Sequence, residues 1–253
     1  MHPILVKFGP FTVYSYGVMV AVGFALAIML LYARAAKFNI DKNKAVDLAM
    51  VILISGIIGA RLLYVLLNPL FFIANPLEII MLSKGGLVWY GGFALALVIS
   101  MVYLGKTGLD FWLAADLIAP YLALAQGFGR IGCFLNGCCY GIKFPAGSAL
   151  AWTSFGSDPR FPSQLISAGI LFLIFAILLI WQNRRRFAGE ILLGYCILYS
   201  GKRFVVEFSR GDNPKILAGL TMAQLISAGL FAAALILFIL RKRRWRKIRT
   251  ISK

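Results

Sequence analysis

Long apolar segments follow one another along the whole sequence, separated by short polar stretches. A helix that crosses a lipid bilayer needs about 20 mostly apolar residues. Seven segments approach that length: Phe11–Leu31, Ala45–Leu67, Leu87–Leu104, Phe111–Gly132, Gln164–Trp181, Ile191–Phe208 and Leu220–Leu240. Unpaired backbone groups are costly in lipid, so these segments are expected to be helices rather than open sheet. The first segment exceeds a signal-peptide core in length and lacks an obvious cleavage site, so we count it as a span.

The composition supports the same class of protein. Hydrophobic residues make up 61% of the 253 residues and charged residues 14%, whereas a soluble domain has about 45–50% apolar and about 25% charged residues. The sequence therefore predicts an all-α integral membrane protein with about seven transmembrane helices. Residues 1–253 are expected to form a single membrane-embedded domain that ends in a basic tail, residues 241–253.

The basic residues between the apolar segments are divided unequally. Sixteen Lys and Arg residues fall on one side of the predicted membrane, eight of them in the tail, and six fall on the other side. Because cytoplasmic loops are enriched in Lys and Arg, this distribution predicts an external N-terminus and a cytoplasmic C-terminus. Beside a membrane helix, attraction of the tail to anionic lipid headgroups is favoured over nucleic-acid binding.

Charged residues also interrupt the apolar segments themselves. Among them are Arg61, Arg130, Lys202, Arg203 and Glu207. Such residues are costly in lipid and by default mark a functional site that faces the bundle interior, although a charge near a helix end can instead reach the membrane surface.

Three charged residues near the end of the sixth segment share a helical face. Arg203, Glu207 and Arg210 have the spacing i, i+4 and i+7. Two interpretations remain open for this face. It is either a structural series of ion pairs or an anion site in which Glu207 orients the arginines.

A glycine-rich stretch, "GRIGCFLNGCCYG", follows the fourth segment at its predicted outer end. Its first part belongs to "GFGRIG", which matches the spacing of a dinucleotide-binding turn. That turn requires a preceding strand within a βαβ unit, and here a membrane segment precedes it. Glycines would still let backbone N–H groups approach a phosphate that Arg130 neutralises.

The same stretch contains three cysteines, Cys133, Cys138 and Cys139. Zinc normally takes four Cys, His or carboxylate ligands, but the spacing C-x4-C-C lacks a paired C-x2-C and the chain has one histidine, His2. A metal site is therefore not predicted from the sequence. A disulfide from Cys133 to one of its neighbours and simple packing of small residues both remain open.

Several motifs, in order along the chain, resemble the bacterial prolipoprotein diacylglyceryl transferases. The glycine-rich stretch with its preceding residues, "GFGRIGCFLNGCCYG", resembles the family signature. The other matching motifs are "YSYG", "GARLLYVL", "GGLVWYGG", "RFPSQL" and "GKRFVVEFSRGDNP". The seven-segment outline with an external N-terminus is also similar to that family.

The resemblance implies a reaction and its substrates. A diacylglyceryl group passes from phosphatidylglycerol, a membrane lipid, to the thiol of the lipobox cysteine in the signal peptide of a preprolipoprotein. A thioether forms and glycerol phosphate leaves. The resemblance implies no cofactor, no metal and no nucleic acid, and it places the enzyme in the bacterial cytoplasmic membrane as a multi-pass protein.

The resemblance also assigns roles to particular residues. It implies catalytic roles for Arg130 and Arg203, and for Tyr90 as the residue at a position where the family usually has histidine. Residues implied in substrate binding are Tyr16, Arg61, Asn136, Gly137, Gly141, Glu207 and Arg210.

Several polar family positions are changed here. Besides Tyr90, the family's usual polar residues are replaced by Cys133, Cys138, Phe161, Ile166 and Ser167. Two alternatives to the transferase therefore stay open: a divergent lipid-binding paralogue with lost or altered activity, and an unrelated transporter. The transporter is less favoured because the sequence has no clear inverted repeat or paired broken helices.

Overall fold

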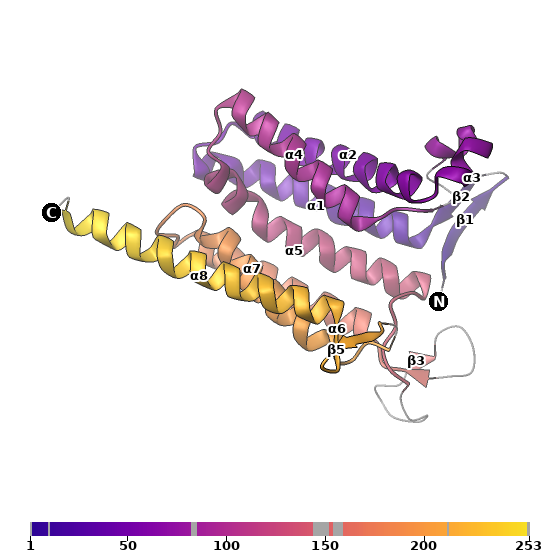
Figure 1. Ribbon diagram of the computed structural model, residues 1–253. Helices are drawn as coiled ribbons and strands as arrows, with labels where there is room; N and C mark the ends of the chain where they lie inside the picture. The colour runs from indigo at the N-terminus through magenta and orange to yellow at the C-terminus, as the bar shows by residue number, and fades with distance from the viewer. Residues whose placement is uncertain are drawn as a thin grey trace. The chain divides into compact units, whose positions relative to one another are not determined.

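The computed structural model describes residues 2–9, 11–81, 85–143, 152–153, 159–211 and 213–251 of the chain, and most of them are helical (Figure 1). The predicted external loop around Ser157 lies outside these residues. The helices are α1 (Ser15–Ala35), α2 (Lys42–Leu67), α3 (Pro69–Ala74), α4 (Trp89–Thr107), α5 (Phe111–Asn136), α6 (Ser163–Gln182), α7 (Glu190–Glu207) and α8 (Met222–Ile251). The shorter elements are η1 (Ala36–Phe38), η2 (Pro76–Ile80), β1 (Ile4–Phe8), β2 (Phe11–Tyr14), β3 (Trp152–Thr153), β4 (Pro159–Arg160), β5 (Lys215–Leu217) and β6 (Leu220–Thr221).

Six helices of the described chain are long and apolar enough to cross a membrane. They are α1 together with η1, α2, α4, α5, α6 and the part Met222–Lys247 of α8. The prediction of a helical membrane protein is confirmed at this level. The remaining predicted span corresponds to α7, which is a helix of 18 residues but carries Glu190, Lys202, Arg203 and Glu207. Because of these four charged residues, α7 does not count among the helices that are apolar enough to cross a membrane. A seventh span therefore remains a prediction.

The first predicted segment does not begin as a helix. Its residues Phe11–Tyr14 form strand β2, which pairs antiparallel with β1, and α1 begins at Ser15. β-Branched and aromatic residues favour strand, and here a neighbouring apolar strand is available to pair with them. The prediction that the first helix begins at Phe11 is therefore wrong, because the first four residues of the segment form a strand. Hydropathy alone does not separate strand from helix.

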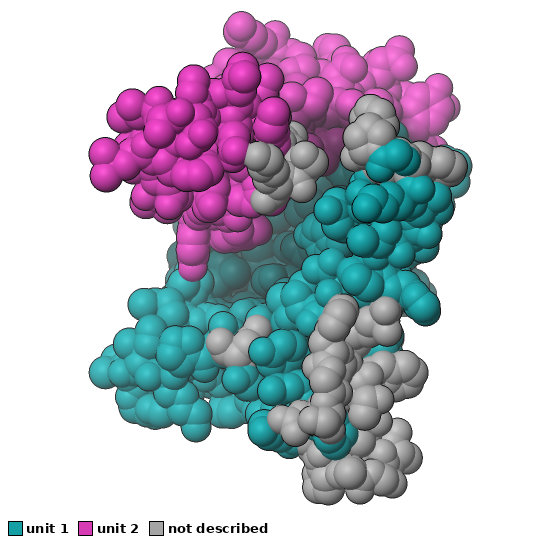
Figure 2. All heavy atoms as spheres, turned by 90° about the vertical axis from the view of Figure 1, so that its right-hand side faces the viewer, with its two compact units in different colours: residues 1–30, 115–253 teal, residues 31–114 magenta. Residues whose placement is uncertain are grey.

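The chain folds into two compact units, coloured separately in Figure 2. Residues 31–114 form one unit and residues 1–30 with 115–253 form the other. In the smaller unit, α2 and α4 pack closely along glycines. A Cβ atom on Gly92 would lie 2.7 Å from the carbonyl oxygen of Gly56, and Gly59 and Gly91 are even closer to each other's carbonyl oxygens. Small residues let helix backbones approach in this way inside membranes.

In the larger unit, the core lies between α5, α6 and α7. Its buried residues are Ala119, Ala123, Leu171, Ile174, Leu178, Ile191 and Tyr195. Helix α8 packs along α7 and continues beyond the apolar part as the basic segment up to Ile251. The predicted basic tail is thus helical from Arg241 as far as the structure describes it.

A buried carboxylate joins α5 to the start of α7. Asp116 is fully buried and accepts hydrogen bonds from the backbone N–H groups of Gly189, Ile191 and Leu192 at 2.7–2.9 Å. The first N–H groups of a helix have no partner within the helix, and a negative charge is favourable at this end. Asp116 therefore caps α7 from a different helix. This contact fixes α7, which carries several of the predicted site residues at its other end.

Candidate active site

The turn after α5 is tied to two other parts of the larger unit. The N–H of Gly141 donates to the carbonyl of Phe161 at 3.1 Å, and the N–H of Ile142 donates to the carbonyl of Ser209 at 3.0 Å. A Cβ atom on Gly141 would lie 2.5 Å from the Phe161 oxygen and 2.8 Å from the Ser209 oxygen. Only glycine fits between these two carbonyls. Gly141 thus holds the start of α6 and the end of α7 next to the end of α5.

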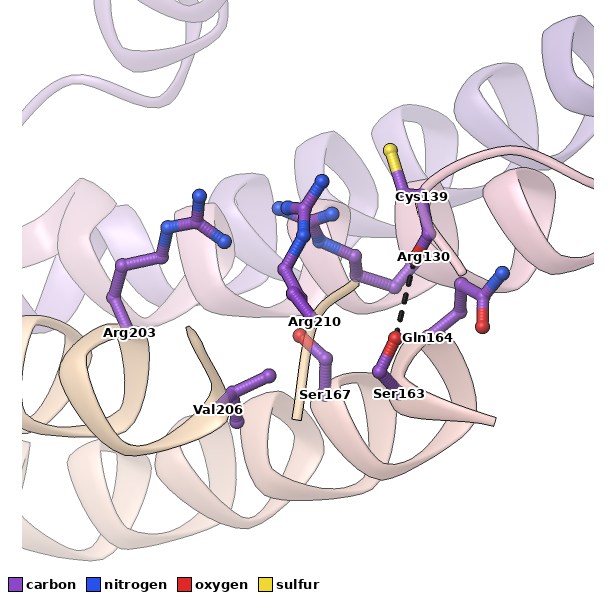
Figure 3. Close-up of a pocket in the computed structure, with 8 residues that line it drawn as sticks. All are labelled: Arg130, Cys139, Ser163, Gln164, Ser167, Arg203, Val206 and Arg210. Atoms are coloured by element: carbon purple, nitrogen blue, oxygen red, sulfur yellow. Dashed lines mark hydrogen bonds between the residues drawn. The ribbon is translucent and has the colours of Figure 1, made fainter. Parts of the chain in front are cut away.

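This arrangement brings three arginines to one cavity. Arg130 comes from α5, Arg203 from α7 and Arg210 from the segment just after α7. Figure 3 shows their guanidinium groups directed toward the same side, with the backbone of α6 below them. The structure therefore brings these three residues together, which their sequence separation does not reveal.

Glu207 is the acidic partner within this group. It is fully buried, and its carboxylate lies 3.0 Å from the Arg203 guanidinium. The same carboxylate accepts hydrogen bonds from the hydroxyl of Thr221, at 2.9 Å, and from the side-chain amide of Asn213. Breaking a buried ion pair by removing one partner is costly. Glu207 thus fixes the position of Arg203 and is itself held from the segment before α8.

Arg130 differs from Arg203 in its partners. Among the described residues, the Arg130 guanidinium has no hydrogen-bond or salt-bridge partner, whereas Arg203 pairs with Glu207. Lys202 is also buried, with its ammonium group 5.5 Å from the centre of the Tyr199 ring. The cavity region therefore carries more positive than negative charge, which favours an anionic ligand.

Polar residues of α6 complete the cavity, and they were not among the site residues predicted from the sequence. Ser163, Gln164 and Ser167 line it and are all buried. The hydroxyl of Ser163 donates to the Cys139 carbonyl at 3.2 Å (dashed in Figure 3), and the amide of Gln164 donates to the Cys138 carbonyl at 2.8 Å. The signal for them was present in "FPSQLIS", where three polar residues interrupt an apolar helix start.

The three cysteines of the glycine-rich stretch converge. The sulfur atoms of Cys133, Cys138 and Cys139 lie within 4.8 Å of one another, and all three are free thiols. The disulfide is thus not formed in this structure. Hydrogen bonding with Cys133 and Cys138 and the charges of Arg210 and Arg130 lower the pKa of the Cys139 thiol from its ordinary value.

Asn136, Gly137 and Tyr16 lie close to this turn. Asn136 ends α5, and Gly137 follows it with a positive φ of 76°, a conformation that glycine adopts without strain. Tyr16 lies at the start of α1, and its ring would lie 3.1 Å from a Cβ atom on Gly132. These residues are therefore at the same end of α5 as the arginine cavity.

Arg61 and Tyr90 belong to the smaller unit. The Arg61 guanidinium donates to five backbone carbonyls, those of Glu78, Ile79, Met81, Gly85 and Gly86. It therefore holds the segment that leads into α4. Its predicted role in substrate binding stays a prediction. Tyr90 lies in the first turn of α4, with 59% of its surface exposed.

The fold and the cavity together define a helical membrane protein with a cavity that is lined by three arginines. The family comparison is more specific. The model of the prolipoprotein diacylglyceryl transferase family matches residues 3–240, and the chain belongs to this family.

Curated relatives match the chain over nearly its full length. A protein of Clostridium tetani is 36% identical over 252 residues, which cover 98% of this chain and all of the relative. A protein of Bordetella avium is 32% identical, with 96% and 95% covered, and one of Clostridium perfringens is 33% identical, with 93% of each covered. The first two are named phosphatidylglycerol–prolipoprotein diacylglyceryl transferase, and the third carries that name with the number 2.

Proposed function

We propose that this chain transfers the diacylglyceryl group of phosphatidylglycerol to the lipobox cysteine of preprolipoproteins. Family membership and the names of the relatives support the reaction class. The observation that carries the proposal is the cavity lined by Arg130, Arg203 and Arg210. The donor lipid is anionic, and the bond to be broken joins its glycerol carbon to a phosphate oxygen.

The chemistry requires a thiolate and a stabilised leaving group. The sulfur of the lipobox cysteine attacks the glycerol carbon, a carbon–sulfur bond forms and the carbon–oxygen bond breaks. The electron pair of that bond leaves with glycerol phosphate, and the thiol proton passes to solvent or to a base. Guanidinium groups that contact the phosphate oxygens stabilise the charge that develops there. Arg130, which has no partner among the described residues, and Arg203, held by Glu207, suit this role.

The remaining predicted residues are proposed to position the substrates. Tyr16, Asn136 and Gly137 lie at the same end of α5 as the cavity, Gly141 joins the segments around it, and Arg210 supplies a third cation. Arg61 is proposed to act by holding the segment before α4, and Tyr90 is kept as a catalytic candidate that acts on the proton of the acceptor thiol. The enzyme is proposed to work as a single catalytic domain in the bacterial cytoplasmic membrane, with seven spans, an external N-terminus and a cytoplasmic C-terminus.

The test is complementation followed by product analysis. The chain is expressed in a bacterium from which the native transferase can be depleted, and the N-terminal peptide of a model lipoprotein is analysed by mass spectrometry. Restored growth together with a diacylglyceryl-modified cysteine is the expected result. Stable, membrane-inserted protein that restores neither would support the divergent paralogue and refute the transferase.

A further inference from the structure

The thiol cluster formed by Cys133, Cys138 and Cys139 has no part in the transfer reaction proposed above. Its three sulfur atoms lie within 4.8 Å of one another, although Cys133 is in the last part of α5 and the other two are in the following turn. The only other cysteine, Cys196, lies in α7. The chain therefore contains a three-sulfur group and, elsewhere, a single thiol for comparison.

The backbone holds the three sulfurs in this arrangement. The Cys138 N–H donates to the Cys133 carbonyl at 3.1 Å, and Gln164 and Ser163 bind the carbonyls of Cys138 and Cys139. Cys139 has a φ of +60°, which costs free energy for any residue with a side chain. Surrounding contacts impose this conformation, so the sulfurs converge before any ligand binds.

We propose that the thiol cluster binds one Cu(I) ion. Thiolate sulfur is a soft ligand that selects soft metal ions such as Cu(I). Metal–sulfur bonds of about 2.3 Å place the three sulfurs of a trigonal site about 4 Å apart, which is within the observed limit of 4.8 Å. Structural zinc sites take four ligands, and this group has three members among the described residues that could ligate a metal.

The surrounding charge suits such a complex. When three copper–sulfur bonds form, three thiol protons are released, and the complex of one Cu(I) with three thiolates carries two negative charges. Cys139 lines the same cavity as Arg130 and Arg210, whose guanidinium groups can neutralise this charge. A buried or half-buried anionic centre needs such partners.

The position of the site has a consequence that rests on the proposed function. A copper–thiolate complex at the cavity would engage the guanidinium groups that otherwise bind the lipid phosphate. Cu(I) is therefore expected to inhibit the transferase reversibly, and the thiol cluster would make lipoprotein modification sensitive to copper.

The binding test needs no substrate. Full-length protein in detergent, kept reduced, is titrated with Cu(I) against a chromogenic Cu(I) chelator. The wild type and Cys196→Ser should each retain one equivalent, and X-ray absorption should show three sulfur ligands at about 2.3 Å. The variants Cys133→Ser, Cys138→Ser and Cys139→Ser should each bind at least about tenfold more weakly, a loss of about 1.4 kcal/mol. Their thermal unfolding midpoints show whether they remain folded.

Three outcomes would overturn the copper site, and the first of them depends on no cluster variant. The first is that the wild-type protein cannot compete with the chelator for Cu(I). The second is that Cys196→Ser weakens Cu(I) binding as much as the cluster variants do, and the third is that the protein binds Zn(II) more tightly than Cu(I) in parallel titrations.

The effect on activity is measured separately. Cu(I) should lower the rate of transfer to a lipobox peptide at least about tenfold, and a chelator should restore that rate. Copper binding without any transferase activity would refute the proposed function and leave the metal site standing, whereas transfer without copper binding would do the opposite.

Discussion

At the scale of single residues, Arg130 and Arg203 share the cavity but differ in their surroundings. Arg203 is held by the buried carboxylate of Glu207, whereas the Arg130 guanidinium has no such partner in the described part of the chain. A planar guanidinium binds phosphate with two parallel hydrogen bonds, and the ammonium of lysine does not. The two positions should therefore be sensitive to a change that keeps the charge.

Arg130→Lys and Arg203→Lys should each lower the transfer rate about 100-fold or more, as the loss of a charge-stabilising donor does in other enzymes. The measurement is transfer from labelled phosphatidylglycerol to a lipobox peptide by purified protein. Arg184→Lys, in the loop between α6 and α7, is the matched control and should keep the full rate. Unchanged rates in both cavity variants would show that these arginines are structural.

Tyr90 tests how the acceptor thiol loses its proton. The chain has no histidine except His2, a phenol is ordinarily a poor base at neutral pH, and a few per cent of a free thiol is already ionised there. Tyr90→Phe should therefore keep a nearly normal rate, and the rate of the wild type should rise with pH toward the thiol pKa of about 8.5. The pH–rate profiles of both proteins are compared. A loss of about 100-fold in Tyr90→Phe would instead identify the hydroxyl as a general base.

At the scale of helices, the glycines of α2 and α4 decide how closely these two elements pack. Gly59 and Gly56 lie on the same helix, yet a Cβ on Gly59 would collide with the Gly91 carbonyl and lie 2.6 Å from the Cβ of Leu95, whereas a Cβ on Gly56 meets open space. This contrast provides a matched pair of substitutions.

Gly59→Ala should destabilise the protein by about 1–3 kcal/mol, because the extra methyl group overpacks the helix contact. Gly56→Ala should be neutral or stabilising by up to about 1 kcal/mol, since alanine favours helix. Thermal unfolding midpoints of the two variants in the same detergent check the difference. Equal midpoints would mean that α2 and α4 do not pack through Gly59.

The cap of α7 by Asp116 is a second feature of this scale. Asp116→Ala would leave the N–H groups of Gly189, Ile191 and Leu192 without this acceptor, and each of the two buried groups, those of Gly189 and Ile191, would cost about 1–3 kcal/mol. Asp110 provides the comparison, because its exposed carboxylate accepts one hydrogen bond from the Leu113 N–H at 2.8 Å at the start of α5. Asp110→Ala should cost only about 1 kcal/mol. A thermal midpoint of Asp116→Ala no lower than that of Asp110→Ala would contradict the cap.

At the scale of the whole molecule, the distribution of basic residues predicts the orientation in the membrane. Reporter fusions after Lys44 and after Arg186 should behave as cytoplasmic, and a fusion near Ser157 as external, because Lys and Arg stay on the cytoplasmic side. A reporter that works only outside the cytoplasm and one that works only inside it are read at each position. A cytoplasmic signal near Ser157 would move the arginine cavity to the other side of the membrane.

The whole-molecule outline was largely predictable from the sequence. A membrane imposes a local and nearly one-dimensional constraint: each spanning segment must be apolar over about 20 residues and helical. Six of the seven predicted segments meet that criterion in the structure. The arginines of the site could also be predicted, because a charged residue within an apolar segment is costly in lipid and by default marks a functional site. The strand at Phe11 was not visible, because its pairing with Ile4–Phe8 depends on a contact outside the segment.

The class of fold, the family and the residues that carry unusual charge could thus all be read from the amino-acid sequence. Which of these residues come into contact depends on the folded chain. Asp116 caps a helix whose N–H groups lie 73 to 76 residues further along the chain. Gly141 fits between two carbonyls from separate segments. The sulfurs of Cys133, Cys138 and Cys139 converge because the chain turns through left-handed backbone conformations there. Hydropathy depends on each residue's own side chain, so it can be read along the chain. Contacts between polar groups depend on the rotation and register of packed helices, which only the folded chain fixes.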